Sequence, residues 1–383
     1  MENTVDSVFI FSPVDFETVQ RHTETYYLSG YCGEHFDTHV CTPSSELTGV
    51  SNHHFRFDGI LGVFCLNVLF VPLWVKLFLS EDPDVVYCYP EVVTPPVLAQ
   101  LVTDASVVFD IRAEPFEQRT EFVSKKNQVV PAFKRSLYAV DRILLDRVLG
   151  RADLVVTLSD DLADKICDNY SVDYSSIHIL PLGVDTEAFK PVDSRYDTEL
   201  NLVYVGTINE LRGLDTFVDA LALLDAEIQS ELRVDLVGAG DEQYIADLLA
   251  MFSETAPAVT LKYHGYIDHE RVPAVAGRSD AAISLLPGLE SYNVSSPAKV
   301  YEYLALGLPV IATDIPAHRR ILTDGRGAII VEENSAEAIA TAVESLLREP
   351  DRIVELSEGA RTSALQHNWE SRFSALFERI EEL

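Results

Sequence analysis

The chain has 383 residues, of which 47% are hydrophobic and 23% are charged, and this composition is that of a folded protein rather than a disordered one. Its length accommodates two domains of ordinary size. The formal net charge of −32 argues against nucleic acid as a partner, because a phosphate backbone would be repelled. Only 8 lysines accompany 21 arginines, and an evenly acidic, lysine-poor chain is typical of a high-salt cytoplasm, where salt screens the self-repulsion.

The five cysteines are an odd number without paired spacing, which indicates free thiols in a reducing cytoplasm. They are Cys32, Cys41, Cys65, Cys88 and Cys167. No cluster has the spacing of metal ligands, so neither a metal nor another cofactor is expected. The N-terminus lacks the basic region of a signal peptide, and we therefore expect a cytoplasmic protein.

Short apolar runs alternate with helix-length segments along the whole chain, a pattern typical of parallel sheets wound with helices. In the first half, strands are predicted at residues 8–12, 38–42, 84–89, 107–111, 154–159 and 177–180. In the second half, they are predicted at residues 201–206, 233–238, 260–266, 281–285, 310–313 and 328–331. The turn-rich segment 181–191 separates the two sets, which predicts two α/β domains of similar size.

The most apolar segment is 59–79, which is long enough to cross a bilayer but contains Asn67, Pro72 and Lys76. It lies between two strands predicted for one sheet, so a membrane crossing would divide that domain. Two other interpretations remain: a buried helix of the first domain, and a helix that dips into the membrane interface and suits a lipid-linked acceptor.

Several turns rich in polar residues or glycine follow predicted strands, where doubly wound sheets bind ligands. The first strand is followed by a loop that ends in Arg21 and His22, and Asp110 and Arg112 end another strand. In the second half, such turns contain Gly206, Thr207, Arg212, Gly238, Gly240 and, after the third strand, Tyr266.

The segment 292–313 predicts a loop, a short helix, a turn and a buried strand. Ser296 is the expected N-cap of the helix, and Pro297 suits its first turn. A helix start offers unpaired N–H groups and the positive end of the dipole, so with Lys299 it predicts an anion site. Glu302 lies further along the helix, where a carboxylate can accept hydrogen bonds from a diol. Phosphate together with a diol indicates a nucleotide.

The same segment reads Ser-Pro-x-Lys-x-x-Glu-Tyr-Leu-Ala-x-Gly-x-Pro-Val-Ile-Ala-Thr over residues 296–313 and resembles the donor-site signature of family 4 glycosyltransferases with the GT-B fold. Outside this stretch, the chain departs from the commoner pattern of that family. Val294 stands where the commoner pattern has a first glutamate, Thr207 replaces a basic residue, and the loop after the first strand lacks a glycine pair.

The resemblance implies two Rossmann-like, doubly wound parallel-sheet domains with a cleft between them: an acceptor-binding domain, 1–185, and a nucleotide-sugar-binding domain, 186–365. A C-terminal helix, 366–383, is expected to cross back to the first domain. The implied donor contacts are Gly206, Thr207, Arg212, Gly238, Gly240, Tyr266, Ser295, Ser296, Lys299 and Glu302. The implied acceptor side contains Arg21, His22 and Asp110, and Arg112 and Glu302 are the implied catalytic residues.

The implied reaction moves a sugar from a nucleoside-diphosphate sugar to a glycan or polyprenyl-linked acceptor, with retention of configuration and without a metal. A sugar-nucleotide epimerase of the same fold and a catalytically silent nucleotide-sugar-binding protein remain as alternatives. A nicotinamide enzyme is disfavoured, since no complete Gly-x-Gly-x-x-Gly follows any predicted strand.

Overall fold

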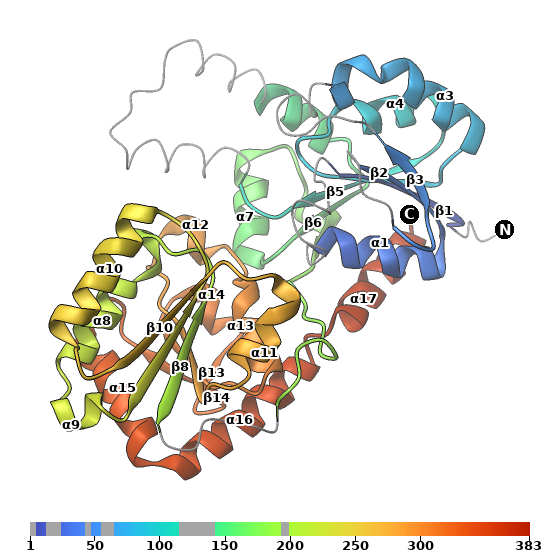
Figure 1. The fold of residues 1–383 in the computed structure, drawn as a ribbon. Helices are drawn as coiled ribbons and strands as arrows, with labels where there is room; N and C mark the ends of the chain where they lie inside the picture. Colours follow the sequence, from blue (N-terminus) through green and yellow to red (C-terminus); the bar gives the residue numbers. More distant parts are fainter. Residues whose placement is uncertain (1–4, 13–23, 43–46, 55–64, 115–141, 193–198) are drawn as a thin grey trace, which may run out of the picture. The chain divides into compact units, whose positions relative to one another are not determined.

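The computed structural model describes residues 5–12, 24–42, 47–54, 65–114, 142–192 and 199–383. The chain divides into two compact units. Unit 1 consists of residues 1–181 together with 370–383, and unit 2 consists of residues 182–369. Each unit is built on one parallel sheet with helices on both faces (Figure 1).

Unit 1 contains a seven-stranded sheet in the order β3-β2-β1-β4-β5-β6-β7, in which all strand pairs are parallel. The strands are β1 (Ser7–Phe11), β2 (Asp37–Thr42), β3 (Ser51–His54), β4 (Val85–Cys88), β5 (Ser106–Ile111), β6 (Leu154–Thr157) and β7 (Ile177–Ile179). The described helices are α1 (Glu24–His35), η1 (Cys65–Leu69), α3 (Val71–Glu81), α4 (Thr94–Val102), α7 (Asp160–Asn169), η2 (Tyr174–Ser176) and α17 (Trp369–Glu381), with further helical residues at 142–149.

Aromatic side chains anchor helices to this sheet. Phe78 and Trp74 of α3 make edge contacts with Phe9 and Phe11 of β1, and all four side chains are buried. The C-terminal helix α17 packs on α1, where Phe373 lies 5.5 Å from the ring of Tyr31. Such aromatic contacts explain why residues 370–383 belong to unit 1 although they follow unit 2 in sequence.

Unit 2 contains the second seven-stranded sheet, in the order β10-β9-β8-β11-β12-β14-β13, again with parallel pairing throughout. Its strands are β8 (Leu200–Val205), β9 (Leu232–Val237), β10 (Thr260–Gly265), β11 (Ala281–Ser284), β12 (Val310–Thr313), β13 (Thr323–Asp324) and β14 (Gly327–Val331). The order of the strands reverses direction at β8 and β11, and ligands of such sheets bind at the carboxyl ends of the strands at this point.

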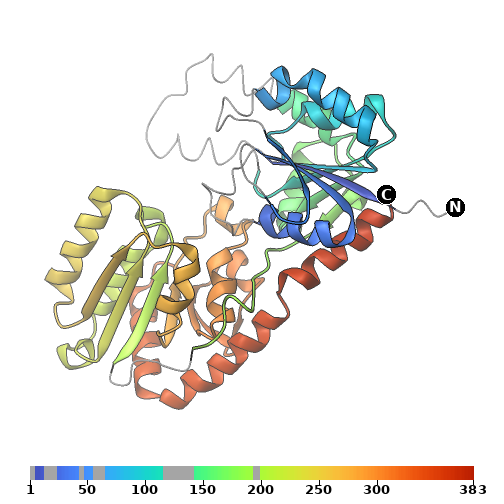
Figure 2. The ribbon, with the colours of Figure 1, turned by 45° about the vertical axis from the view of Figure 1, so that its right-hand side comes forward.

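Helices cover both faces of the second sheet (Figure 2). One face carries α8 (Leu214–Ala222), α10 (Glu242–Thr255) and α15 (Ala336–Arg348), whose apolar residues form one core. The other face carries α11 (Val272–Ala276), α13 (Ala298–Ala305) and α16 (Pro350–Leu365), which enclose a second core. The remaining short helices are η3 (Glu210–Arg212), α9 (Ala226–Gln229), η4 (His269–Arg271), α12 (Glu290–Asn293) and α14 (Pro316–Arg319).

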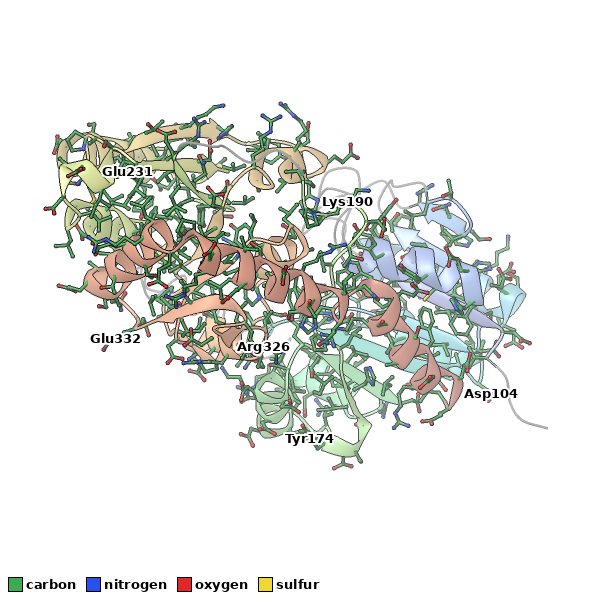
Figure 3. The ribbon with its side chains drawn as sticks, turned by 90° about the horizontal axis from the view of Figure 1, so that it is seen from below. Asp104, Tyr174, Lys190, Glu231, Arg326 and Glu332 are labelled. Atoms are coloured by element: carbon green, nitrogen blue, oxygen red, sulfur yellow. The ribbon has the colours of Figure 1, made fainter. Side chains whose placement is uncertain are left out.

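The predicted fold class is confirmed, because both halves are doubly wound parallel sheets and all twelve predicted strands are present. Two strands were missed, β3 and β13. Among the described residues, no helix is long and apolar enough to cross a membrane. Cys32, Cys41, Cys88 and Cys167 are free, as expected. Figure 3 shows acidic side chains such as Asp104, Glu231 and Glu332 pointing away from the ribbon, and all three are exposed.

Candidate functional site

The candidate site lies at the carboxyl ends of β8 and β11. The turn after β8 begins with Gly206 and Thr207 and continues to Arg212, and the loop after β11 runs from 285 to 297 and ends where α13 begins. These two segments therefore meet at the reversal point of the sheet, which is where the topology predicts a ligand.

The backbones of two strand-end turns cross closely beside this site. A Cβ atom on Gly238 would lie 1.9 Å from the carbonyl oxygen of Gly206, and a Cβ on Gly240 would lie 1.9 Å from that of Ile208. The amide of Ile208 donates to the carbonyl of Ala239 over 3.0 Å, which fixes the crossing. Backbone packing thus requires glycine at 238 and 240, which we predicted to be donor contacts.

Lys299 extends from α13 to the end of β8. Its Nζ lies 4.2 Å from the ring centroid of Tyr204 and donates to the Tyr204 hydroxyl over 3.2 Å. A Cβ on Gly206, whose φ is +143°, would lie 2.6 Å from this Nζ, so glycine leaves room for the ammonium group. Burial, followed by the nearby charge of Arg212, lowers the pKa of Lys299 to about 7.

Arg212 ends the short helix η3 and is the second cation of the site. Its guanidinium lies 5.4 Å from the ring centroid of Tyr292, over the face of that ring. Its Nε is buried and has no hydrogen-bond partner among the described residues. A buried donor without an acceptor is costly, so this nitrogen suits a ligand that supplies oxygen atoms.

The start of α13 differs in detail from the prediction. The N-cap residue is Pro297 rather than Ser296, and it provides no side-chain hydrogen bond to the first turn. The Ser296 hydroxyl instead lies 3.1 Å from that of Tyr301, and the Ser295 hydroxyl donates to the carbonyl of Tyr292. The amide of Val300 donates to the carbonyl of Pro297 over 3.0 Å. Because no side chain caps the helix, the N–H groups that precede it in the first turn are left for another acceptor.

Glu302 lies one turn further along α13 and accepts a hydrogen bond of 2.7 Å from Nε2 of His269. The imidazole of His269 in turn packs on Phe189, with ring centroids 5.0 Å apart. The bond to histidine involves Oε1 of the carboxylate, and both side chains retain some exposure, 17% for Glu302 and 18% for His269. The histidine therefore orients a carboxylate that can still accept from a ligand.

The other residues predicted in unit 2 border the same edge of the sheet. Thr207 is exposed, and its carbonyl accepts from the Tyr204 hydroxyl over 2.7 Å. Tyr266 follows β10, and 62% of its surface is exposed. An exposed aromatic ring at this edge of the sheet is available for stacking.

In unit 1, Asp110 and Arg112 form an internal brace rather than an open site. The carboxylate of Asp110 is fully buried, accepts from the Tyr87 hydroxyl and forms an ion pair with Arg112. Arg112 also donates to the carbonyl of Leu180 over 3.0 Å. Asp110 therefore has no surface for an acceptor, and its structural effect is to orient Arg112. Arg21 and His22 lie outside the described residues.

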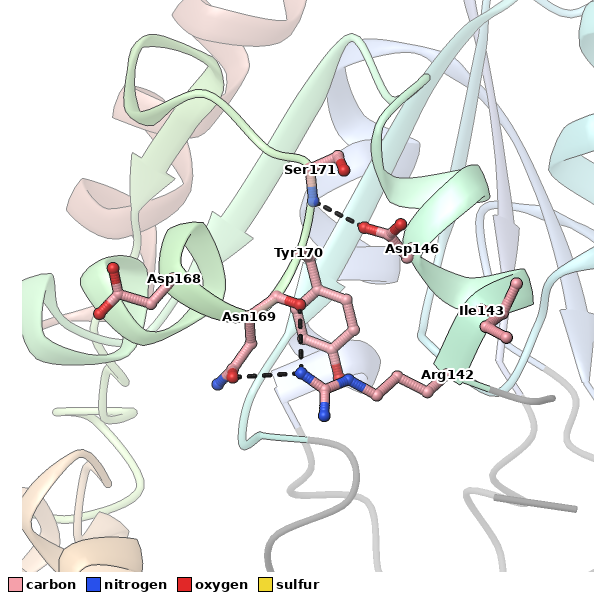
Figure 4. Close-up of a pocket in the computed structure, with 7 residues that line it drawn as sticks. All are labelled: Arg142, Ile143, Asp146, Asp168, Asn169, Tyr170 and Ser171. Atoms are coloured by element: carbon pink, nitrogen blue, oxygen red, sulfur yellow. Dashed lines mark hydrogen bonds between the residues drawn. The ribbon is translucent and has the colours of Figure 1, made fainter. Parts of the chain in front are cut away.

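A separate pocket of about 370 Å³ in unit 1 contains none of the predicted residues (Figure 4). Arg142 donates there to the carbonyl and side-chain oxygens of Asn169, and Asp146 accepts from the amide of Ser171. These bonds close the C-terminal end of α7, so the polar groups of the pocket already serve the fold.

Sequence reasoning missed three partners of the predicted residues: Tyr204, His269 and Tyr292. Tyr204 lies within a strand and reads as a core residue, and 95 residues separate it from the lysine that it contacts. Tyr292 was inside the quoted segment, but its contact with Arg212 depends on tertiary folding. No local signal identifies such pairs.

Two family profiles match the chain, and together they cover more than four fifths of it. Residues 23–188 match "Glycosyltransferase Family 4", and residues 199–349 match "Glycosyl transferases group 1". Among curated proteins, the chain is 26% identical over 244 residues to D-inositol 3-phosphate glycosyltransferase 2 of Catenulispora acidiphila, a match that covers 60% of this chain and 56% of that protein. The chain spans little more than half the length of the curated relatives it matches.

Solved structures match almost the entire chain at low sequence identity. HepE of Anabaena in complex with UDP gives a TM-score of 0.75 at 13% identity, covering 99% of this chain and 100% of that one. A glycosyltransferase from Rickettsia africae gives a TM-score of 0.73 at 15% identity, covering 99% and 98%. These likenesses support the fold, and the sequence profiles support the family. The chain therefore belongs to the group 1, family 4 glycosyltransferases and has their GT-B fold.

Proposed function

We propose that the protein transfers a sugar from a nucleoside-diphosphate sugar to a glycan or polyprenyl-linked acceptor, in the assembly of cell-surface glycans or glycoproteins. The observation that carries the proposal is the pair Arg212 and Lys299 beside the uncapped start of α13. The chain has 61 carboxylates and only 29 lysines and arginines, yet neither of these two cations is ion-paired among the described residues. An anionic ligand is the partner that this arrangement lacks.

In this proposal, unit 2 holds the donor. Arg212, Lys299 and the first N–H groups of α13 would stabilise the departing diphosphate without a metal, because fixed charges and dipoles favour the developing negative charge. Glu302, oriented by His269, would accept hydrogen bonds from the ribose hydroxyls. The exposed ring of Tyr266 would border the base. The remaining proposed donor contacts are Gly206, Thr207, Gly238, Gly240, Ser295 and Ser296.

Unit 1 is the proposed acceptor domain. Arg112 of unit 1 and Glu302 of unit 2 are the proposed catalytic residues. Arg21 and His22 are proposed on the acceptor side, where the buried Asp110 would act through Arg112. Arg112 is already oriented by Asp110 and by the carbonyl of Leu180. We further propose retention of anomeric configuration, with the leaving phosphate taking the acceptor proton on the same face.

Contact with a membrane would give a lipid-linked acceptor access to the enzyme. The support is the exposed apolar surface of η1 and α3 within segment 59–79, where Val68, Leu69 and Leu73 are each about half exposed, at 52%, 58% and 49%. We propose a cytoplasmic enzyme that touches the inner face of the membrane through this surface. Sedimentation with liposomes in molar salt tests it, and a protein that stays in the supernatant argues against lipid contact.

The donor proposal is tested by calorimetric titration in molar KCl with UDP, GDP, ADP and their sugar conjugates. UDP comes first, because HepE was solved with UDP. Replacing one charged partner of a diphosphate costs about 1.5–3 kcal/mol, so Arg212→Gln is expected to weaken binding roughly 10- to 100-fold.

The matched control is Arg348→Gln. This arginine belongs to the same unit, is 69% exposed and pairs with Glu344 on the surface, so its removal should leave donor affinity unchanged. Equal effects of both substitutions would point to general electrostatics instead of a site. Wild-type protein that binds none of the nucleotides would refute the proposal.

A further inference from the structure

Arg320 follows the short helix α14 and contacts the loop that leads into α13. Its Nη2 donates to the carbonyl oxygen of Ser295 over 3.0 Å and also to that of Asn293. These contacts join residues that are 25 and 27 positions apart in sequence. One guanidinium group thus holds two carbonyls of the segment that immediately precedes Pro297.

The two hydrogen bonds decide how the peptide groups of this loop are turned. None of the described peptide bonds is cis, so the Ser295 carbonyl and the Ser296 N–H point in opposite directions across one planar unit. With the carbonyl held by Arg320, the Ser296 N–H faces away from the arginine. This N–H forms no backbone hydrogen bond among the described residues, as expected of a donor reserved for a ligand.

The same contacts change the electrostatics of the site. A free carbonyl oxygen beside a diphosphate would repel it, whereas a carbonyl bound to a guanidinium is neutralised and brings a positive charge with it. The loop also carries Tyr292, whose ring lies under the guanidinium of Arg212. The position of the loop therefore affects both the N–H groups and one of the two cations.

The geometry points to Arg320 as a positioning residue for the diphosphate of the donor. It fixes the 293–296 loop with the carbonyls turned toward itself and the Ser296 N–H turned to the opposite side, and it does so without touching the ligand. This inference rests on the proposed function, since it assigns Arg320 a role in the same site.

The neighbouring Arg319 provides a matched control. It is the last residue of α14 and forms a two-point ion pair with Asp314, at 2.6 and 2.9 Å, in which both side chains are about half exposed. Arg319→Gln and Arg320→Gln remove the same charge from adjacent positions, and only the second removes the bonds to the loop.

The experiment measures dissociation constants for wild type, Arg319→Gln and Arg320→Gln with the nucleoside diphosphate that the wild type binds and with the corresponding nucleoside. Two charge-assisted hydrogen bonds are lost in Arg320→Gln, so the diphosphate should bind about tenfold more weakly or worse. The affinity for the nucleoside should stay unchanged, because the nucleoside has no phosphate group to contact the loop. Arg319→Gln should match the wild type for both ligands.

Chemical rescue adds a second readout. Free guanidinium ion should restore part of the diphosphate affinity of Arg320→Ala and have no such effect on Arg319→Ala. Equal losses for nucleoside and nucleoside diphosphate, or unchanged diphosphate affinity in Arg320→Gln, overturn this inference while leaving the proposed function intact. A wild type that binds no nucleotide overturns both.

Discussion

At the residue scale, the central feature is a lysine that sits in an unfavourable position without a ligand. Lys299 is packed against Tyr204 and lies near Arg212, and burial and that neighbouring charge hold the pKa of its ammonium group at about 7. A bound diphosphate would supply opposite charge at this point and return the pKa toward its ordinary value. Ligand binding and proton uptake should therefore be coupled.

The sign of this coupling gives a prediction. Above pH 7 the free protein holds Lys299 largely neutral, so binding must take up a proton and becomes weaker as the pH rises. From pH 7 to pH 8.5, affinity for UDP-glucose should fall about tenfold, whereas below pH 6.5 it should be nearly constant. Calorimetry in buffers of different ionisation enthalpy should detect close to one proton taken up at pH 8.5.

The sugar conjugate is the right probe for this measurement, because its diphosphate carries no group that titrates near pH 7. Lys299→Arg serves as the control, since a guanidinium stays charged over this range and should give a flat profile. Proton uptake of the same size in Lys299→Arg would assign the coupling to another group.

The sequence alone identifies the charged residues of this site better than their surroundings. Lys299 and Glu302 could be predicted because a helix start and its first turns are local features of the chain. The residues that contact these two side chains could not be predicted in this way. His269 lies 33 residues from Glu302, and Tyr204 lies 95 residues from Lys299, so each contact exists only after the sheet has formed.

At the element scale, the site depends on how closely the turns after β8 and β9 approach each other. Gly206 and Gly238 both have positive φ, +143° and +140°, and the second would place a Cβ against the carbonyl of the first. Because two backbone segments are in contact here, an added Cβ atom could be accommodated only if the ends of the two strands moved apart. The glycine turn is therefore a packing requirement that places the turn of Gly206 beside Lys299.

Gly238→Ala should accordingly destabilise unit 2 by more than about 3 kcal/mol, because it combines backbone strain with an unavoidable clash. Gly265→Ala separates these two effects. Gly265 has φ of +65° and open space around the missing Cβ, so its substitution should cost only about 1 kcal/mol. Urea unfolding followed by circular dichroism gives both values. Similar losses in the two variants would show that strain alone explains the glycine.

The strands themselves were largely predictable, and the two exceptions share a cause. β3 consists of Ser51, Asn52, His53 and His54, and β13 has only two residues, so neither has an apolar run. Both are edge strands that pair on one side only. Such strands form through backbone hydrogen bonds to a neighbouring strand that is already in place. This pairing produces no periodic pattern of apolar side chains in the sequence.

At the scale of the whole molecule, the charge of −32 must be reconciled with two folded α/β units. Carboxylates such as Asp104, Glu231 and Glu332 are exposed at the surface (Figure 3). Negative charges on a surface repel one another, and dissolved salt shortens the range of this repulsion. Ion pairs offset little of this repulsion, because acidic side chains outnumber basic ones by 61 to 29.

We therefore predict that the melting temperature rises steeply with KCl from dilute buffer to molar concentration. The Debye length shrinks from about 30 Å at 0.01 M to about 3 Å at 1 M, which removes repulsion between all but neighbouring carboxylates. Sucrose at matched osmolality is the control, since it strengthens burial without screening charge. A melting temperature that responds equally to sucrose and KCl, or to neither, would show that electrostatic repulsion does not limit the stability of this fold.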